Sequence, residues 1–329
     1  MNILKCNVEV YQKAFYVHTA PPAPNVIMKW LLRLLIRWLG NLPLRFNHIV
    51  GAMLGQIAWW LSKRHRRISQ QNLAHYAAWS MQTRQPVASD MAAAVITEQG
   101  KGISELAIAW TAPVERLYTL VKACDGWQHV DVAKANNRSI IFVTPHLGCY
   151  DIAGRYLESR LPVMALYRPP KQKWLEPIMQ AGRIRGGGST ASADAGGVRA
   201  LLKTLKTGGN IIMLPDQVPG HGDGVWADFF GRPAYTMTLL PRLAEATGAV
   251  VLFFFAERLP KGQGYHVHIE AMQEPFSSEK NIAARQINAM VETLISKAPS
   301  QYLWGYNRYK HPAGAPLPPD FNPLSHASS

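Results

Sequence analysis

Short apolar runs and helical stretches alternate along the chain from Trp127 onward. The spacing of apolar positions predicts helices near residues 150–159, 172–182, 195–207, 236–247 and 279–297. Runs rich in β-branched and aromatic residues predict the strands Ile140 to Val143, Val163 to Tyr167, Ile211 to Leu214, Val250 to Phe255 and Tyr265 to Ile269. This alternation indicates an α/β fold, a mixed sheet of mostly central strands flanked by helices.

Two segments near the N-terminus have a different pattern. In residues 28–39, Lys29, Arg33 and Arg37 lie on one helical face and Trp and Leu surround the rest, which predicts a basic amphipathic helix. Residues 46–62 contain no Lys, Arg, Asp or Glu and end in two tryptophans before a basic cluster at 63–67. Such a run is shorter than the roughly 20 residues of a membrane span. Its aromatic and basic end is typical of a membrane interface, although a core helix beside a solvated charged face has the same pattern.

These patterns divide the chain into five regions. We expect a loose leader at 1–27, a basic membrane-anchoring segment at 28–67, and a helical region at 68–125, broken at Pro86 and Pro113 and without strands. The α/β core follows at 126–310, and a tail rich in Pro, Ala and Ser occupies 311–329 and is expected to be flexible. No cleavable signal peptide is evident in the first region.

Charge and cysteine content narrow the possible functions. The net charge is +14, and no acidic residue occurs between Tyr11 and Ser89. Such a basic block favours a polyanionic partner, and the Trp and Leu residues within it favour an anionic membrane surface over nucleic acid. Three cysteines far apart argue against a disulfide framework or structural zinc and indicate a reducing compartment. The Gly186-Gly187-Gly188 run matches no nucleotide-binding motif, and we expect neither a metal nor a cofactor.

Polar residues follow three of the predicted strands directly. His146 and Asp151 come after the first strand, Arg168 after the second, and Asp216 and Gln217 after the third. Ligands of open α/β sheets bind beyond the carboxyl ends of the strands, so these side chains are expected on one rim.

The spacing of His146 and Asp151 predicts a catalytic pair, with ordinary strand-to-helix punctuation as the alternative. Asp151 would accept a hydrogen bond from one ring nitrogen, while the other nitrogen takes a proton from a substrate hydroxyl. That hydroxyl can then attack an acyl carbonyl directly, without a serine nucleophile. Cys149, inside the same motif, is either a thiol nucleophile or a small buried residue.

An ordered set of motifs resembles the lipid A late acyltransferases (lauroyl and myristoyl acyltransferases), within the glycerolipid acyltransferase superfamily marked by His-x4-Asp/Glu. The motifs run from HLGCYD at 146–151 through YRPPKQKWLEPIM at 167–179, GRIRGG at 182–187, LPDQ at 214–217 and FFGRPAYTMT at 229–238 to QYLWGYNRYK at 301–310. The resemblance covers most of the chain, from about Met28 to Lys310.

This resemblance implies an enzyme on the cytoplasmic face of a Gram-negative inner membrane. It would move a fatty acyl chain from acyl carrier protein to a hydroxyl of a lipid A precursor, with His146 as base and no cofactor. Arg168 and Asp216 would belong to the site, and Arg168, Lys171, Arg183 and Arg185 are basic residues suited to substrate phosphates. Two alternatives stay open: an acyltransferase for another acceptor, such as lysophosphatidic acid or a glycolipid, and a non-catalytic membrane or nucleic-acid binder. No nucleic-acid-binding module is recognisable, so no nucleic-acid partner is expected.

Overall fold

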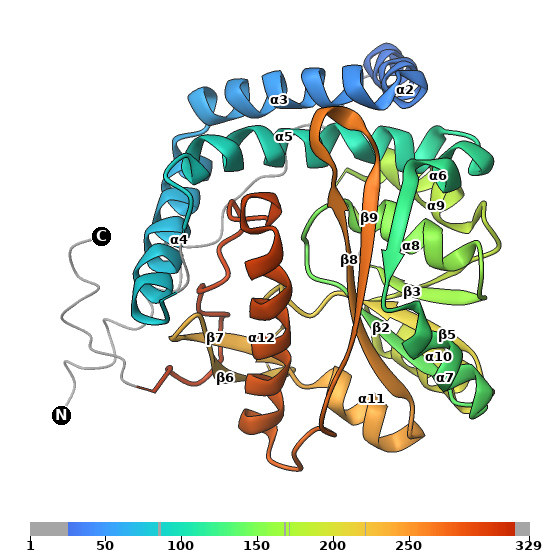
Figure 1. The fold of residues 1–329 in the computed structure, drawn as a ribbon, viewed down its shortest axis with the longest axis vertical. Coiled ribbons are helices and arrows are strands. Elements are labelled where there is room, and N and C mark those ends of the chain that lie inside the picture. The colour runs from blue at the N-terminus through green and yellow to red at the C-terminus, as the bar shows by residue number, and fades with distance from the viewer. Residues whose placement is uncertain (1–25, 85–86, 168, 171, 221, 320–329) are drawn as a thin grey trace.

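A seven-stranded sheet forms the centre of the molecule (Figure 1). The computed structural model describes residues 26–319 except 85–86, 168, 171 and 221. All neighbouring strands are parallel except β8 and β9, which are antiparallel. The sheet order is β1 (Val121–Asp125), β9 (Tyr265–Ala271), β8 (Val250–Arg258), β2 (Ile140–Val143), β5 (Asn210–Met213), β3 (Val163–Tyr167) and β4 (Ser189–Ser192).

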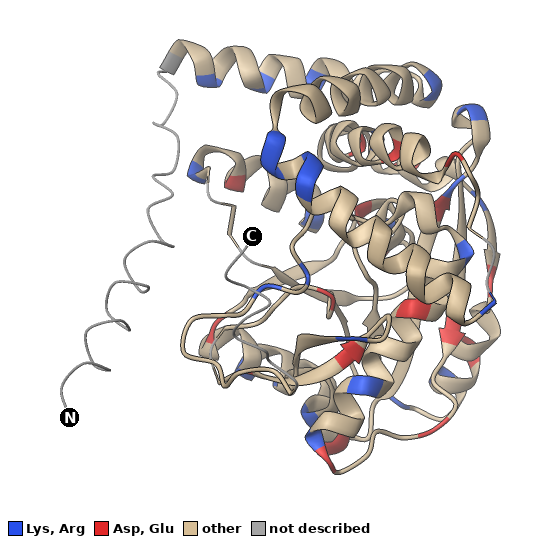
Figure 2. Ribbon diagram, turned by 90° about the vertical axis from the view of Figure 1, so that its left-hand side faces the viewer, with Lys and Arg blue, Asp and Glu red and all other residues tan. Residues whose placement is uncertain are grey.

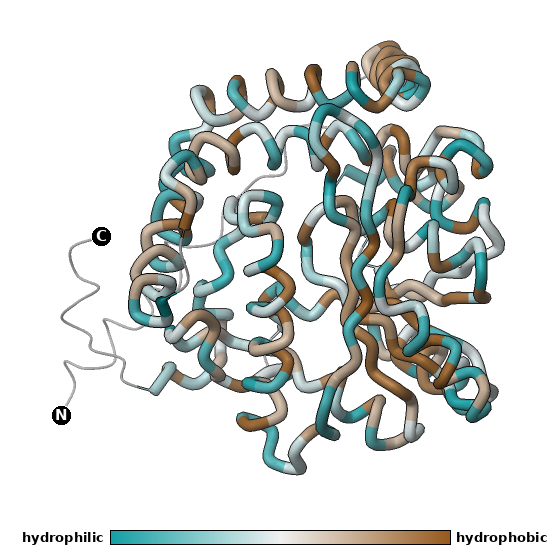
Figure 3. Tube along the Cα trace, viewed as in Figure 1, coloured by the Kyte–Doolittle hydropathy of each residue, from teal (hydrophilic) through white to brown (hydrophobic). Residues whose placement is uncertain are grey.

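Each face of the sheet is covered by helices, and each has its own core. Along β2, Ile141 and Val143 belong to one core and Ile140 and Phe142 to the other, as the two-residue period of a strand requires. The first face packs against α10 (Ala195–Lys206), α11 (Leu239–Thr247) and α12 (Lys280–Lys297). The second packs against α5 (Met91–Thr111), α6 (Val114–Leu120), α7 (Trp127–Ala135) and α8 (Tyr150–Glu158). The hydropathy trace is accordingly brown through the lower part of the central strands (Figure 3).

The N-terminal helices form a separate layer above the sheet. α3 (Leu44–Leu61) lies along α5, with α2 (Val26–Asn41) beyond one end and α4 (Lys63–Gln82) at the other (Figure 1). A Cβ added at Gly100 would meet the Gly51 carbonyl oxygen at 2.0 Å. Gly51 and Gly55, which lie four residues apart on α3, therefore allow close contact with α5 inside this chain.

Remaining elements extend the core. α9 (Glu176–Ile184) follows the turn η1 (Lys173–Leu175) and packs against α5. The hairpin of β6 (Gly224–Phe229) and β7 (Arg232–Met237) packs against α12. Two further short turns, η2 (Pro260–Gly262) and η3 (Pro299–Gln301), lie on the α3 and α5 side.

The structure confirms the α/β fold and corrects several boundaries. The five predicted strands are the five inner ones of the seven-stranded sheet. Both edge strands, β1 and β4, and the two strands of the hairpin, β6 and β7, were missed. The region 68–125 is therefore not wholly helical, because it ends in β1. Residues 236 and 237 belong to β7 rather than to the helix predicted at 236–247. α2 begins at Val26, two residues inside the expected leader, and the rest of that leader lies outside the described residues.

Part of the expected tail is packed. Ala315 is buried against Val218 and Tyr235, and the Trp226 indole N–H donates to the Pro316 carbonyl at 2.8 Å. Tail residues 320–329 lie outside the described part of the chain. None of the helices within the described residues has both the length and the apolarity needed to cross a bilayer.

Candidate functional site

The loop between β2 and α8 carries His146, and its backbone is held by two other segments. The Cys149 N–H donates to the Ala256 carbonyl at 3.0 Å, and the Leu303 N–H donates to the His146 carbonyl at 3.0 Å. Gly148 has a φ of +58°, and a Cβ there would meet the Ala256 oxygen at 1.9 Å. Only glycine fits this turn, so the position of His146 depends on close contact with β8.

Asp216, just after β5, holds His146 at two points. Its Oδ1 accepts from the ring Nδ1 at 2.8 Å, and its Oδ2 accepts from the His146 backbone N–H at 2.8 Å. Burial alone would raise the pKa of the Asp216 carboxyl, but electrostatic attraction to His146 and these two hydrogen bonds outweigh the effect of burial, so the pKa is lowered. Asp216 is thus an anion that fixes both the main chain and the ring of His146.

This contact determines the tautomer of His146. A carboxylate can only accept, so the proton lies on Nδ1 and the lone pair on Nε2. The Nε2 atom lies 3.1 Å from the side-chain nitrogen of Gln217, which is the donor that such a lone pair requires. The histidine is therefore arranged to accept a proton at Nε2.

The expected contact between His146 and Asp151 is not the one observed. Asp151, in the first turn of α8, accepts from Arg183 Nε at 3.1 Å and from Nη2 at 3.4 Å. The His-x4-Asp spacing favoured Asp151, but the helix directs its carboxylate toward α9 while Asp216 reaches the ring from the next strand. Asp216 was predicted to belong to the site, because Pro215-Asp216-Gln217 follows a strand directly. That position was the sequence signal for its contact with His146.

A cavity of about 770 Å³ opens beside this histidine. It is lined by His146, Gln217, Asp151 and Arg183, and by apolar side chains that include Leu166, Met179 and Leu214. Four of the predicted site residues thus line one cavity. Asp216 is not part of the lining, but it contacts His146. Arg168 and Lys171, also predicted to bind substrate, lie outside the described residues.

Glu158 and Tyr150 are ionisable groups that also line this cavity. Glu158 at the end of α8 is buried beside Arg155, whose Nη2 donates to it at 2.6 Å. Burial outweighs the attraction of Arg155 and raises the pKa of Glu158 to about 7. Tyr150 lies edge-on to His146 with 5.1 Å between ring centroids, and burial raises its pKa. Neither residue was selected from the sequence, because one carboxylate or phenol on a helix carries no motif.

Cys149 is buried, and burial raises the pKa of its thiol well above the usual value. A thiol that stays protonated is a poor nucleophile. The structure therefore favours the account of Cys149 as a small core residue.

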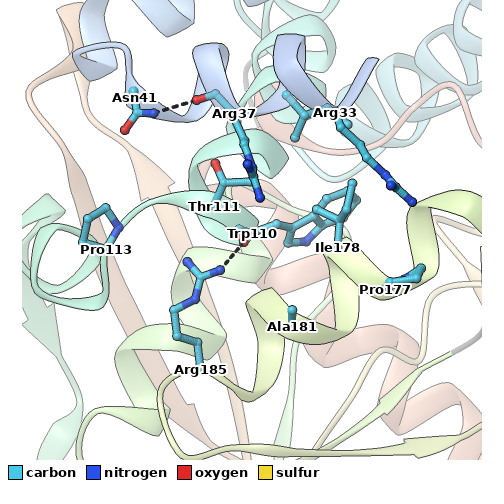
Figure 4. Close-up of a pocket in the computed structure, with 11 residues that line it drawn as sticks. Arg33, Arg37, Asn41, Trp110, Thr111, Pro113, Pro177, Ile178, Ala181 and Arg185 are labelled. Atoms are coloured by element: carbon cyan, nitrogen blue, oxygen red, sulfur yellow. Dashed lines mark hydrogen bonds between the residues drawn. The ribbon is translucent and has the colours of Figure 1, made fainter. Parts of the chain in front are cut away.

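A second cavity, of about 640 Å³, lies between α2, α5 and α9. Arg33 and Arg37 project into it from α2, and Arg185 projects from the opposite wall, where it donates to the Trp110 carbonyl at 3.2 Å (Figure 4). No Asp or Glu is among the described residues that line this cavity. Trp110 borders both cavities.

The fold and site together define an α/β protein with a histidine–carboxylate pair in a cavity beyond the carboxyl ends of its inner strands. The chain belongs to the family of bacterial lipid A biosynthesis acyltransferases, whose model matches residues 18–311.

Curated relatives agree with this assignment. The chain is 28% identical over 303 residues to the lipid A biosynthesis lauroyltransferase of Escherichia coli strain K12, covering 91% of this chain and 96% of the relative. It is 28% identical to the palmitoleoyltransferase of the same organism, covering 87% and 92%. A lipid A biosynthesis acyltransferase of Haemophilus influenzae is 27% identical, covering 84% and 85%.

Proposed function

We propose that this protein transfers a fatty acyl chain from acyl carrier protein to a hydroxyl of a lipid A precursor, with His146 as general base. The family supports acyl transfer in lipid A biosynthesis. The observation that carries the proposed mechanism is the Asp216–His146 contact, which places a proton on Nδ1 and leaves the Nε2 lone pair at the cavity.

The proposed reaction needs one proton transfer in each direction. Nε2 of His146 removes the proton of the acceptor hydroxyl as its oxygen attacks the thioester carbonyl carbon. The tetrahedral intermediate collapses with cleavage of the C–S bond, and the imidazolium returns the proton to the departing sulfur. The products are an ester and a free thiol, so no covalent enzyme intermediate forms. Asp216 stays ionised and stabilises the imidazolium.

Other cavity residues are proposed to hold the substrates. The carboxylate of Asp151 orients Arg183, whose Nη1 has no hydrogen-bond partner among the described residues and suits a phosphate or carboxylate. Apolar side chains at Leu166, Met179 and Leu214 offer a surface for an acyl chain. Arg168 and Lys171 are proposed as further anion-binding residues on the same rim.

We further propose that α2 and α3 attach the protein to the cytoplasmic face of the inner membrane. Their apolar side chains are strongly exposed, with Trp30 at 58% and Trp60 at 75%. Lys and Arg recur along α2 (Figure 2), and the Arg33–Arg37–Arg185 cavity offers three guanidinium groups to lipid phosphates (Figure 4). An apolar face beside basic side chains is what a helix lying in an anionic interface requires.

A transfer assay with purified full-length protein tests this proposal. Two acyl donors are compared: a labelled acyl chain on acyl carrier protein, and the same labelled chain on coenzyme A. The two acceptors are a lipid A precursor and lysophosphatidic acid. We expect the first donor and the first acceptor to be used, and His146→Ala to lose the activity. Cys149→Ala, the matched control in the same loop, is expected to stay active. Preference for lysophosphatidic acid would contradict the proposed lipid A acceptor. An inactive wild-type protein would favour the alternative of a non-catalytic binding protein.

A further inference from the structure

Three metal-ligating side chains meet at the outer edge of the sheet, apart from the cavity of His146. Asp125 ends the edge strand β1, and His266 and His268 lie two residues apart on β9. Side chains at that spacing point to the same face of a strand. β1 pairs in parallel with β9, and the register places Asp125 opposite His268. Asp125 and the histidines are far apart in the chain, so no ligand spacing was visible in the sequence.

Their donor atoms are close enough for one ion. One nitrogen of each histidine and one oxygen of Asp125 all lie within 4.8 Å of one another. Asp125 Oδ2 is 2.9 Å from His266 Nε2 and 3.9 Å from His268 Nδ1. Bonds of about 2.0 to 2.1 Å at a tetrahedral ion place two ligand atoms roughly 3.3 Å apart, between these two distances.

One hydrogen bond of the cluster leaves the lone pair of His268 facing inward. Glu257 on β8 accepts from His268 Nε2 at 2.9 Å, so Nδ1 is the unprotonated nitrogen and faces Asp125. A separation of 3.9 Å is too long for a hydrogen bond. His266 Nε2 is a buried atom without a hydrogen bond, although Asp125 is near it. The lone pair of His268 Nδ1, directed at a carboxylate, repels it unless a cation lies between them.

We propose that Asp125, His266 and His268 bind one divalent transition-metal ion of the Zn²⁺ class. Imidazole nitrogens select Zn²⁺, Ni²⁺ or Cu²⁺ over Mg²⁺ and Ca²⁺. Water fills the remaining position, because Asp125 is 69% exposed and the site is open on that side. Glu257 orients His268 from behind, as carboxylates do for many metal-bound histidines.

The bound ion has a structural role at this position. β1 is an edge strand, and its pairing with β9 has a register shift between Val121 and Ala123. A metal bonded to both strands ties the end of β1 to the sheet just before Gly126 and α7. Metal binding to the folded chain alone raises its stability, so the site can be measured without any assay of acyl transfer.

Direct metal binding tests the proposal. Full-length protein without a histidine tag is treated with chelator, dialysed against Zn²⁺ alone, and analysed for metal content and for Tm. We expect one Zn²⁺ per chain and a saturable rise in Tm. His266→Ala and His268→Ala should lose both, while the exposed His311→Ala, outside the cluster, should retain both.

Two milder variants protect the test against loss of folding. Asp125→Asn changes an exposed side chain and should weaken Zn²⁺ binding without lowering the Tm of the metal-free protein. Glu257→Gln keeps all three ligands and should weaken the affinity about 10- to 100-fold, as loss of a supporting carboxylate does elsewhere. Wild-type protein that binds no Zn²⁺, or binding that is unchanged in both histidine variants, would overturn the proposal.

Discussion

His146 has its two ring nitrogens in different surroundings, and this asymmetry is what its proposed role requires. Nδ1 faces the anionic Asp216, while Nε2 faces the cavity and the amide of Gln217. A substrate hydroxyl at the position of the Gln217 amide would meet the lone pair. Asp151, which the spacing motif suggested, holds Arg183 instead.

Exchange of each carboxylate separates these two roles. Asp216→Asn removes the charge that supports the imidazolium, so the rate of transfer should fall about 10²- to 10⁴-fold, the range of a positioned acid–base system. Asp151→Asn should act mainly through Arg183, with a rise in KM and a smaller change in kcat. Steady-state kinetics with thermal melts measure both.

The kinetics of these two variants also decide which carboxylate supports His146. Equal kcat for Asp216→Asn and wild type, with a collapse in Asp151→Asn, would restore the pair that spacing predicts.

Glu158 makes a pH-dependent contribution to stability. Its pKa is raised to about 7 in the folded protein, so the folded state binds more protons than the unfolded state between about pH 4.5 and 7. The contribution is present at low pH and is lost as the pH rises through 7. Glu158→Gln removes this titration, so its free energy of unfolding should fall less than that of wild type between pH 5 and 8. Parallel curves for the two proteins would contradict the raised pKa.

At the level of elements, the sequence predicted what is buried on both faces. Four of the five inner strands contain continuous apolar runs, as in Ile140 to Val143, and β9 alternates apolar and polar residues. All five were recognised. The edge strand β4 has the sequence Ser-Thr-Ala-Ser and β1 contains Lys122 and Asp125, so neither has a comparable apolar signal. Edge strands are defined by the neighbour they pair with, which the local pattern does not record.

The site residues also divide into those that the local sequence predicts and those that depend on contacts between distant segments. His146, Asp216 and Gln217 were predicted together because each follows an inner strand, and the end of a strand is a local feature. The predicted contact between Asp151 and the His146 ring was wrong, because the carboxylate that reaches the ring depends on the direction of α8 relative to β5. The cluster of Asp125 with His266 and His268 depends on β1 pairing with β9, and it was invisible for the same reason.

A buried ionic network joins the α3 layer to the loop of His146. Glu105 on α5 accepts from His48 at 2.6 Å and from Arg258 at 2.8 and 2.9 Å. Arg258 Nη2 in turn donates to the Gly148 carbonyl at 2.8 Å. Burial alone would raise the pKa of Glu105, but Arg258, His48 and Tyr265 outweigh it and lower the pKa. The layer proposed to meet the membrane is thereby connected to the loop that carries His146.

Removal of the central charge should be costly. Glu105→Gln leaves Arg258 buried without its main anion, so we expect a loss of about 3 to 5 kcal/mol in the free energy of unfolding. Glu98→Gln is the matched control, since Glu98 contacts the same Arg258 at 3.4 Å from a less buried position. Chemical denaturation of both variants measures the difference. A loss for Glu105→Gln no larger than that for Glu98→Gln would show that the network contributes little.

On the scale of the whole molecule, apolar and basic surface gather on one layer. α3 is buried only where Gly51, Gly55 and their neighbours meet α5, and its other face carries exposed Phe46, Met53 and Trp60. α2 continues this surface with Trp30 and Trp38. The sheet lies below this layer (Figure 1). Arg33 and Arg37 are part of α2 itself, so a membrane bound here would be on the same side as the Arg33–Arg37–Arg185 cavity.

Vesicle binding separates the apolar and the electrostatic parts of this attachment. Arg33→Gln with Arg37→Gln should weaken binding to anionic vesicles at low salt by roughly 5-fold per charge, since each basic residue near such a surface contributes about 1 kcal/mol. Trp30→Ser, Trp38→Ser and Trp60→Ser together should abolish the binding that survives in 1 M salt, where charges are screened beyond about 3 Å. A triple change of exposed apolar residues elsewhere, Met81→Ser, Val132→Ser and Ile282→Ser, is the control and should bind like wild type. Complete release of the wild type by salt would leave only the electrostatic part, because a buried apolar face is not displaced by screening.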